Sequence, residues 1–326
     1  MNFTYSFIIP HHNTPDLLQR LIDSIPQRED IEIIVVDDNS DDDKKANINR
    51  PDVRTIYIDK EHTKGAGRAR NVGMDAATGK WLLFADADDF YKSDFIDILD
   101  EYKDDDIEIL FFNVDSVESD TLLPITSRSN LPRKLIENYN GSVASSEDLL
   151  YLCYTPWRRM QRLDFLRYYG LRFEEIPKGN DVFFTYQTAY FVKKWKMDSR
   201  EVYIVTYRND SMSYHPKTRF LYKNALLSLR KREKFFSYIG HSDWNKKCAR
   251  GNNIHSVFRY LMRVVKHQPL NGIKAILYYL THLYYIEKRS NYYIDVIEDI
   301  KSKVACHDIL NNNRTYRKIS MTLRRN

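Results

Sequence analysis

The sequence has little cysteine and no apolar run long enough to cross a membrane. Its three cysteines, Cys153, Cys248 and Cys306, are far apart and form no C-x-x-C pair. We therefore expect reduced thiols in the core of a cytosolic protein, not a disulfide framework or a cysteine metal site. The most apolar late stretch, residues 273–286, is interrupted by a lysine and a histidine. It is also shorter than the ~20 residues of a spanning helix.

A secretory signal is absent too, because the first residues contain no basic segment followed by an apolar one. We therefore predict a cytoplasmic protein, with a peripheral position at the inner face of the cell membrane as an open alternative.

A Gly-rich dinucleotide fingerprint is missing as well. Residues 10–15, between the first predicted strand and helix, read Pro-His-His-Asn-Thr-Pro. The lack of G-x-G-x-x-G argues against a nicotinamide or flavin enzyme. The lack of a G-x-G-T-R-type loop disfavours a sugar-phosphate nucleotidylyltransferase. The glycines of residues 64–73 do not have the spacing of a P-loop.

Charge divides the chain into two parts. Residues 1–200 carry a net charge of −10 and residues 201–326 a net charge of +15. Since 326 residues exceed one typical domain, we predict one domain over 1–215 and a basic, Tyr-rich helical region over 216–326. Such a basic region suggests an anionic partner, for example lipid headgroups, nucleic acid or a phosphorylated substrate.

Short apolar runs alternate with helix-period segments over the first third of the chain. Strands are predicted at 5–9, 31–36, 55–58, 80–84 and 107–114, and helices at 15–25, 67–77 and 93–102, the last with Ser93 as a cap. This order predicts an α/β fold with a mainly parallel sheet covered by helices on both faces. Ligands bind such sheets beyond the carboxyl ends of the strands, where the polar groups at 10–13, 37–40 and 86–89 fall.

Three carboxylates follow the fourth predicted strand. Asp86, Asp88 and Asp89 come directly after the apolar run 81–84. Charges at the end of a buried strand must be solvated or neutralised, and a divalent cation that binds a diphosphate would neutralise them. The alternative is an acidic turn at the surface.

Two further motifs lie before this acidic cluster. Residues 37–40 read Asp-Asp-Asn-Ser, and an acid there can accept hydrogen bonds from a base or from ribose hydroxyls. In residues 64–73, small side chains permit close backbone approach, and Arg68 and Arg70 supply planar cationic donors suited to phosphate. An ordinary acidic loop and a Gly-containing loop with solvated arginines are the alternatives.

Together these motifs resemble the family 2 glycosyltransferases of the GT-A fold. The resemblance covers roughly residues 3–215 and rests on four segments in the family's order: Phe7-Ile8-Ile9-Pro10 with Asn13, Val36-Asp37-Asp38-Asn39-Ser40, Gly67-Arg68-Ala69-Arg70-Asn71-Val72-Gly73, and Asp86-Ala87-Asp88 with Asp89. It implies a GT-A nucleotide-sugar-binding fold followed by the helical region.

The resemblance implies a nucleotide-sugar site formed by Pro10, Asn13, Asp38, Arg70, Asn71, Asp86 and Asp88. By this resemblance, Pro10 and Asp38 would line the pocket for base and ribose. Asp38 is the member of its acidic pair that would touch the base. Arg70 and Asn71 would lie beside the nucleotide.

A divalent metal is also implied by the resemblance. Asp86 would lie near the ribose and the sugar, while Asp88 together with Asp89 would hold Mg²⁺ or Mn²⁺ against the diphosphate. A hard ion held by carboxylate oxygens stabilises the charge on such a leaving group. His215 is a further candidate to reach the metal or the diphosphate, with a structural histidine as the alternative.

Asp181 is the candidate catalytic base. The segment 177–184, Pro-Lys-Gly-Asn-Asp-Val-Phe-Phe, resembles the family's Gly-Glu-Asp-x-x-Phe motif, whose Asp is the base of inverting members. Such a base takes the proton from the acceptor hydroxyl. Asn180 stands where the family has Glu, so the contribution of that Glu is weaker or different here. Asp181 also fits a helix N-cap, and both roles can hold.

Trp157 and Arg158 are the acceptor candidates. The segment 155–159, Thr-Pro-Trp-Arg-Arg, resembles a family segment near the acceptor site. Trp157 could stack on a sugar ring, and Arg158 or Arg159 could meet an acidic sugar or a lipid diphosphate. The alternative is a tryptophan that anchors a helix in the core.

Residues 216–326 show no such resemblance. Helices are predicted at 217–239 and 253–267, and a face could be formed by Tyr278, Tyr279, Leu283, Tyr284, Tyr285, Tyr292 and Tyr293. Beside basic residues, this face would suit an anionic membrane leaflet. A helical bundle with a solvated basic face, or a homodimer surface, is the alternative. Nucleic acid is disfavoured because no recognised module accompanies the charge.

The sequence thus predicts a metal-dependent, inverting glycosyltransferase that moves a sugar from a UDP-sugar to a glycan or lipid-linked glycan hydroxyl. The Q-x-x-R-W motif and the membrane helices of the family's processive synthases are absent from the sequence. This favours transfer of one or a few sugars, as in bacterial capsule, lipopolysaccharide or exopolysaccharide synthesis. The alternative is a noncatalytic nucleotide-sugar-binding protein or a membrane-associated scaffold of polysaccharide assembly.

Overall fold

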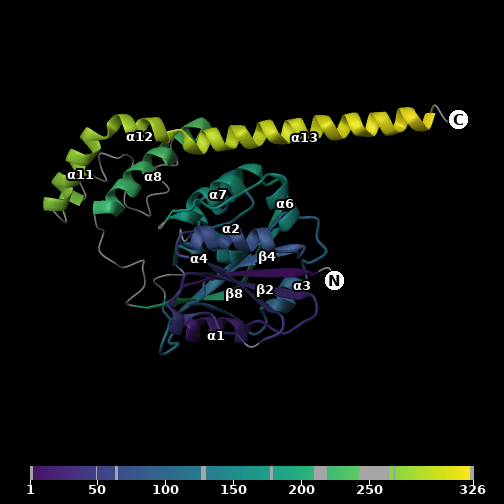
Figure 1. The fold of residues 1–326 in the computed structure, drawn as a ribbon, viewed down its shortest axis with the longest axis horizontal. Coiled ribbons are helices and arrows are strands. Elements are labelled where there is room, and N and C mark those ends of the chain that lie inside the picture. The colour runs from purple at the N-terminus through teal and green to yellow at the C-terminus, as the bar shows by residue number, and fades with distance from the viewer. Residues whose placement is uncertain are drawn as a thin grey trace. The chain divides into compact units, whose positions relative to one another are not determined.

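The computed structural model describes residues 3–48, 50–62, 65–125, 130–176, 179–208, 219–241, 261, 264–266 and 269–323. The chain divides into two compact units, Met1–Ser211 and Met212–Asn326. The first unit is an α/β structure, and the described part of the second is helical (Figure 1).

A mixed, mainly parallel sheet forms the centre of the first unit (Figure 1). Its eight strands among the described residues lie in the order β3 (Val53–Ile58), β2 (Ile31–Asp38), β1 (Tyr5–His11), β4 (Trp81–Phe84), β7 (Arg159–Arg162), β6 (Ile109–Glu118), β8 (Trp195–Tyr207) and β5 (Phe90–Tyr91). Strands β3, β2, β1 and β4 are parallel, β7 is antiparallel to β4 and β6, β8 is parallel to β6, and β5 is antiparallel to β8. The predicted α/β class is confirmed. The short strands β5 and β7 are absent from the sequence prediction.

Helices cover both faces of this sheet (Figure 1). Helices α1 (Pro15–Ser24) and α3 (Phe95–Asp100) contribute to a core on one face, and α2 (Ala66–Ala76) lies against the other. The unit also contains α4 (Asn130–Glu137), α5 (Val143–Leu152), α6 (Leu163–Tyr168) and α7 (Asn180–Phe191). The cap predicted for α3 is wrong, because Asp94 and not Ser93 occupies its N-cap position.

Side chains of the central strands alternate between the two faces. Phe7 and Ile9 of β1 lie in a buried cluster with Leu18 of α1, whereas Ile8 between them faces α2. A Cβ atom on Gly73 of α2 would lie 2.3 Å from Ile8 Cγ2. Glycine at this position therefore lets α2 lie directly against β1.

Helix α7 begins one residue before Asp181. Gly179 occupies its N-cap position with φ of 75°, and the helix starts at Asn180. A left-handed φ of this kind suits glycine. The N-cap role predicted for Asp181 is therefore wrong, and its carboxylate lies in the first turn of α7.

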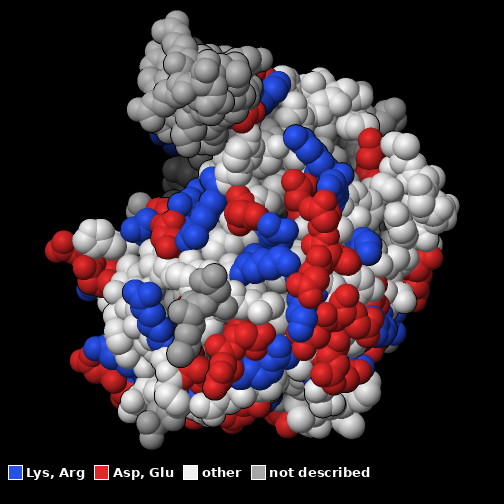
Figure 2. All heavy atoms as spheres, turned by 90° about the vertical axis from the view of Figure 1, so that its right-hand side faces the viewer, with Lys and Arg blue, Asp and Glu red and all other residues white. Residues whose placement is uncertain are grey.

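Many acidic side chains of the first unit are paired with basic ones. Arg28 contacts Asp30 and Asp100 at 2.8 and 2.7 Å, and Arg200 contacts Glu101 at 2.6 Å. Figure 2 views the molecule from the side on which the chain begins, and acidic and basic side chains are interleaved on that face. Although residues 1–200 carry a negative net charge, this face of the molecule is therefore not uniformly acidic.

The second unit contains α8 (Arg219–Tyr238), α11 (Pro269–Thr281), α12 (Leu283–Ser290) and α13 (Tyr292–Leu323) among its described residues. Glu287 of α12 contacts Arg230 and Lys234 of α8 at 2.6 and 3.0 Å. The helix predicted at 217–239 is confirmed by α8, and most of the helix predicted at 253–267 lies outside the described residues. No described helix is both long and apolar enough to span a bilayer.

Two expectations for side chains of the second unit need correction. Tyr293 is only 1% exposed, so it belongs to the core and not to an aromatic surface, whereas Tyr284 is 81% exposed. Cys306 is exposed although a core thiol was expected, while Cys153 of the first unit is buried as expected. Cys248 lies outside the described residues.

The contact between α2 and β1 leads to a first prediction. Gly73→Ala should lower the free energy of unfolding by about 1–3 kcal/mol, because the added methyl group would overlap Ile8. Urea denaturation measures the loss. Combining Gly73→Ala with Ile8→Ala should cost less than the sum of the two single changes. Simple additivity would show that this contact does not constrain residue 73.

Candidate functional site

Polar side chains from three neighbouring strands meet at the carboxyl edge of the sheet. The register pairs His11 at the end of β1 with Asp37 at the end of β2, and Ile8 with Phe84 at the end of β4. The residues that follow these strands therefore share one edge. This is the edge at which an α/β sheet binds ligands.

A buried network fixes the ends of β1 and β2. The Asp37 carboxylate lies 3.0 Å from His11 Nδ1 and accepts hydrogen bonds from the backbone amides of Ser40 at 2.8 Å and Ala46 at 3.1 Å. Burial alone would raise the pKa of Asp37. The hydrogen bonds from His11 and the two amides outweigh it and hold the pKa at about 2. The sequence analysis assigns no role to His11. Its position after the first predicted strand, with Asp37 after the second, is the signal that could have indicated this contact.

Three of the predicted nucleotide-sugar residues, Asp38, Asn13 and Pro10, lie around this network. Asp38 accepts a hydrogen bond from the backbone amide of Gly65 at 2.9 Å, which ties the end of β2 to the loop before α2. Asn13 adopts a φ of 59° and binds Asp41 through both ends of its amide, at 3.0 and 2.8 Å. Pro10 lies half-buried beside them at the end of β1. The structure brings all three to one corner of the edge.

Arg70 connects α2, the loop after β4 and α7. Its guanidinium contacts the Asp86 carboxylate at 2.6 Å and donates to the Asn180 side-chain oxygen at 2.9 Å. It also lies over the ring of Phe173, 5.4 Å from the centroid. One buried cation therefore positions both an acid predicted to be near the donor sugar and the residue next to the predicted base, Asp181.

The role implied for Asn71 needs correction. Its side chain is 5% exposed, donates to the carbonyl of Phe173 at 3.1 Å and accepts from the amide of the same residue at 3.0 Å. Asn71 therefore holds the segment before α7 and does not present its amide to a nucleotide. The same closeness explains Gly67, where a Cβ atom would lie 2.2 Å from the carbonyl oxygen of Glu174.

Asp89 is an internal anchor of the loop after β4. It is 2% exposed, accepts from the Tyr203 hydroxyl at 3.0 Å and accepts from the Thr206 amide at 2.7 Å. Burial, followed by repulsion from Asp88 and Asp86, raises the pKa of Asp89 well above its ordinary value. Both carboxylate oxygens thus have partners inside the fold, and the metal contact of Asp89 stays a prediction.

Asp88 is held through its backbone and through its side chain. Its carbonyl oxygen accepts from Arg20 at 2.7 Å and from the Thr206 hydroxyl at 2.6 Å, while its carboxylate lies 3.3 Å from Arg208. Its side chain stays 26% exposed. Of the two acids predicted to hold a metal, Asp88 is the one that can reach a ligand.

The donor set fits a metal only in part. The described residues contain no group of three or more His, Cys, Asp or Glu side chains that could hold an ion. The carboxylates of Asp86 and Asp88 are hard oxygen donors, and Mg²⁺ at diphosphate sites is commonly bound by one or two carboxylates plus substrate phosphates. The site therefore fits an ion whose remaining ligands come from the substrate. His215 lies outside the described residues.

Asp181 is half-buried at the start of α7. Burial is the largest influence and raises the pKa of its carboxyl group. The charges of Arg70 and Arg159 lower it, while Asp86 raises it further. A carboxylate with a raised pKa is a better proton acceptor than an ordinary aspartate near neutral pH.

Trp157 and Arg158 lie in the core, which corrects the acceptor prediction. Trp157 is 7% exposed and stacks on Tyr203, with ring centroids 5.3 Å apart. Arg158 is 1% exposed. The neighbouring Arg159 is also buried and donates to the hydroxyls of Thr185 at 2.7 Å and Thr188 at 2.9 Å. This segment therefore packs inside the fold next to Tyr203, and its buried side chains are not exposed to an acceptor.

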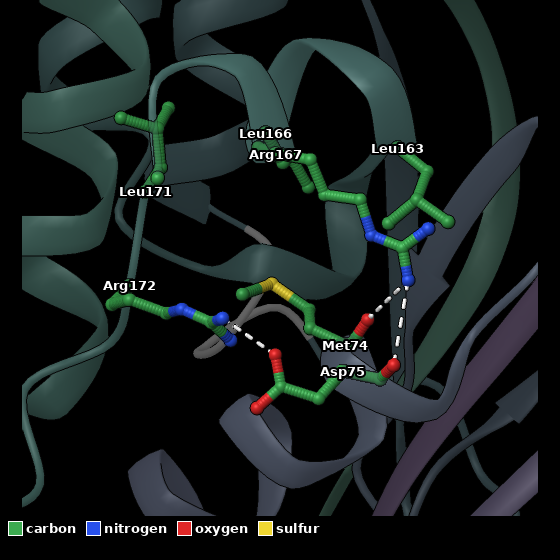
Figure 3. Close-up of a pocket in the computed structure, with 8 residues that line it drawn as sticks. Met74, Asp75, Leu163, Leu166, Arg167, Leu171 and Arg172 are labelled. Atoms are coloured by element: carbon green, nitrogen blue, oxygen red, sulfur yellow. Dashed lines mark hydrogen bonds and ion pairs between the residues drawn. The ribbon is translucent and has the colours of Figure 1, made fainter. Parts of the chain in front are cut away.

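A small cavity of about 80 Å³ at the end of α2 is separate from this edge. It is lined by Met74, Asp75, Leu163, Leu166, Arg167, Gly170, Leu171 and Arg172. Figure 3 shows Arg167 pointing to the backbone carbonyls of Met74 and Asp75, and Arg172 pointing to the Asp75 carboxylate. Arg167 satisfies the last carbonyls of α2, so the cavity is a packing gap at a capped helix end.

Comparisons with known proteins identify relatives of the first unit. Residues 6–166 match the sequence model of glycosyl transferase family 2. A GalNAc(5)-diNAcBac-PP-undecaprenol beta-1,3-glucosyltransferase of Campylobacter jejuni is 39% identical over 90 residues, which are 26% of this chain and 29% of that protein. A UDP-Glc:alpha-D-GlcNAc-diphosphoundecaprenol beta-1,3-glucosyltransferase, WfaP of Escherichia coli, is 37% identical over 89 residues, or 26% and 36% of the two chains. The chain thus matches about a third of the length of these relatives.

The fold also matches a solved structure. Residues 1–349 of TarS from S. aureus, in complex with UDP-GlcNAc, superimpose with a TM-score of 0.59 and 18% sequence identity. The match covers 93% of this chain and 92% of that one. It supports the predicted GT-A architecture with C-terminal helices.

The buried network at the ends of β1 and β2 leads to a second prediction. Asp37→Asn should lower the free energy of unfolding by about 2–4 kcal/mol, because it removes a buried carboxylate with three hydrogen-bond donors. The folded pKa of about 2 lies below the ordinary 3.8, so this stabilisation is complete above about pH 5 and falls as the pH drops. About half of the charge contribution should be gone by about pH 3.

Urea denaturation of both proteins between about pH 6 and pH 3 measures the effect. The control is Asp42→Asn, because that side chain is 95% exposed and should change stability by less than about 0.5 kcal/mol. A difference between wild type and Asp37→Asn that does not vary with pH would contradict the assigned pKa.

Proposed function

Because this chain belongs to glycosyltransferase family 2, we propose that it transfers a sugar from a nucleotide donor to a glycan hydroxyl in bacterial polysaccharide synthesis. One observation carries the proposal. Arg70 contacts both Asp86 and Asn180, so an acid of the donor side and the base candidate Asp181 belong to one site. Nucleotide sugar and acceptor hydroxyl must meet in such a place.

We further propose a UDP-sugar as donor and a lipid-linked glycan as acceptor. A protein of the same fold was solved with UDP-GlcNAc, and two relatives are named for glucosyl transfer to undecaprenol-linked sugars. Pro10 and Asp38 lie at the carboxyl ends of β1 and β2, and we propose that the base and ribose bind beside them. Transfer of one or a few sugars per encounter completes the proposal.

In the proposed reaction Asp181 acts as general base. Its carboxylate takes the proton of the acceptor hydroxyl, the hydroxyl oxygen forms a bond to the anomeric carbon, and the bond to the diphosphate oxygen breaks on the opposite face. The configuration at the anomeric carbon is inverted by this single displacement. The raised pKa of Asp181 makes proton transfer to it easier.

Asp88, with Asp86 beside it, would hold Mg²⁺ or Mn²⁺ in this proposal. Such an ion supplies positive charge that stabilises the diphosphate as it leaves. The 26% exposure of the Asp88 side chain leaves it accessible, and Arg208 near it adds a second positive charge.

Substitution of Asp88 and substitution of Asp181 should impair different steps of the reaction. Asp88→Asn should lose Mn²⁺-dependent binding of UDP, because the hard oxygen donor is replaced by a neutral amide. Asp181→Asn should bind UDP as the wild type does but lower the transfer rate by about 10²–10⁴-fold, the usual contribution of a general base. Calorimetry with UDP and Mn²⁺ measures binding, and product formation from UDP-sugars measures transfer.

Asp97→Asn is the matched control, because Asp97 is an exposed residue of α3 and its loss should leave both measurements unchanged. Full transfer by both site variants would overturn the assignment. UDP binding without transfer from any UDP-sugar would instead favour a noncatalytic binding protein.

The residue next to the base leads to a prediction for the pH dependence. The transfer rate should fall as the pH drops through the pKa of Asp181. This acidic limb of the pH–rate profile should lie above pH 3.8, the ordinary pKa of an aspartate, because the pKa of Asp181 is raised. Asn180→Glu adds a negative charge beside Asp181 and should move the limb up by about 0.5–1 pH unit. Asn180→Gln is the neutral control and should leave the limb in place. Identical pH profiles for the two variants would show that Asp181 does not control the rate.

A further inference from the structure

An exposed apolar stripe runs along α11 in the second unit. It consists of Leu270, Ile273, Leu277 and Leu280, whose side chains are 77%, 53%, 57% and 63% exposed. Their spacing of three, four and three residues places them on one face of the helix. We call these four residues the α11 stripe.

Among the described residues this stripe stays exposed and is not part of the packing between helices. The opposite face of α11 already packs on α8 through Ala275, which is 2% exposed and lies in a cluster with Leu226. Helix α11 is therefore apolar on both faces, whereas an ordinary surface helix has a polar outer face. A contiguous exposed apolar patch of this kind marks an interaction site.

Basic side chains accompany the α11 stripe. Between residues 264 and 292 the sequence has four cationic residues, Lys266, Lys274, Lys288 and Arg289, all of them exposed, and a single acid, Glu287. That acid is paired with Arg230 and Lys234 of α8. The exposed charges of α11 and α12 are therefore positive, and the 81% exposed Tyr284 of α12 adds an aromatic side chain.

We propose that α11 binds the surface of an anionic lipid bilayer through this stripe. Apolar side chains that are flanked by lysine and arginine are typical of helices that lie in the plane of a membrane interface. The ten-residue rise from Leu270 to Leu280 spans about 15 Å, half of a hydrocarbon core, so α11 lies on the bilayer and does not cross it. Exposed tyrosine suits the headgroup level.

Charge favours a bilayer over a second copy of this chain. A twofold dimer contact brings the same surface of both copies together, so Lys274 and its basic neighbours would face one another. An anionic leaflet attracts each of these cations instead. The proposal goes beyond sugar transfer and does not rest on it, because binding to lipid requires neither donor nor acceptor.

Vesicle co-sedimentation tests the proposal with the full chain. Wild-type protein should bind vesicles of mixed phosphatidylglycerol and phosphatidylcholine, and should bind vesicles of phosphatidylcholine alone at least about tenfold more weakly. Salt should weaken the binding. Leu277→Ser combined with Leu280→Ser should lower the partition coefficient roughly tenfold or more, because two apolar side chains no longer leave water.

The matched control is Leu122→Ser combined with Leu123→Ser, since these first-unit leucines are 49% and 64% exposed and should not affect binding. Circular dichroism checks that both double variants fold. Failure of the wild type to bind anionic vesicles, or unchanged binding by the Leu277/Leu280 variant, would overturn the proposal. So would a lipid-free dimer that this variant converts to a monomer, because the stripe would then be a contact between two copies.

Discussion

The site depends on the buried guanidinium of Arg70. This single group contacts Asp86 after β4 and Asn180 at the start of α7, segments that are 94 residues apart in the sequence. The backbone at Gly67 comes close enough to Glu174 to exclude any side chain, so α2 carries Arg70 to within reach of both. Removing the cation would leave a half-buried acid and an amide without their shared donor, which is a larger loss than one surface ion pair.

A second layer of residues holds the acids without touching a ligand. The Tyr203 hydroxyl accepts from the Asp86 amide at 2.9 Å and donates to Asp89 at 3.0 Å, and Trp157 stacks on the face of the same tyrosine. Asp89 in turn binds the backbone of Thr206. The loop after β4 is thereby fixed to β8. A tryptophan that resembles a sugar-stacking residue in the sequence therefore acts on the site through packing.

The sequence predicts those features that depend on local pattern. Continuous apolar runs identify β1, β2 and β4, and the alternation of strands and helices identifies the fold class. Strand β7 escapes prediction because it reads Arg-Met-Gln-Arg, which resembles an exposed segment. Its Arg159 is buried because the Cys153 carbonyl and two threonine hydroxyls of α7, which lie 26 and 29 residues later, accept its hydrogen bonds. No local pattern can reveal partners at that distance.

The acidic pairs show the same limit in the site itself. Asp37 and Asp38 are adjacent, yet strand alternation sends the first inward to His11 and leaves the second to bind Gly65. Asp88 and Asp89, in the turn between β4 and β5, also differ, since one is half-buried and the other is enclosed. Residue type and spacing locate such a cluster, but only the packing around each carboxylate decides which oxygen can meet a ligand.

Net charge by itself does not identify a binding surface either. Many acids of the first unit are paired with bases, as Asp100 is with Arg28. The exposed cations of α11 and α12, in contrast, accompany an apolar stripe that stays exposed among the described residues. Charge together with unused apolar area, and not charge alone, points to a surface that binds lipid.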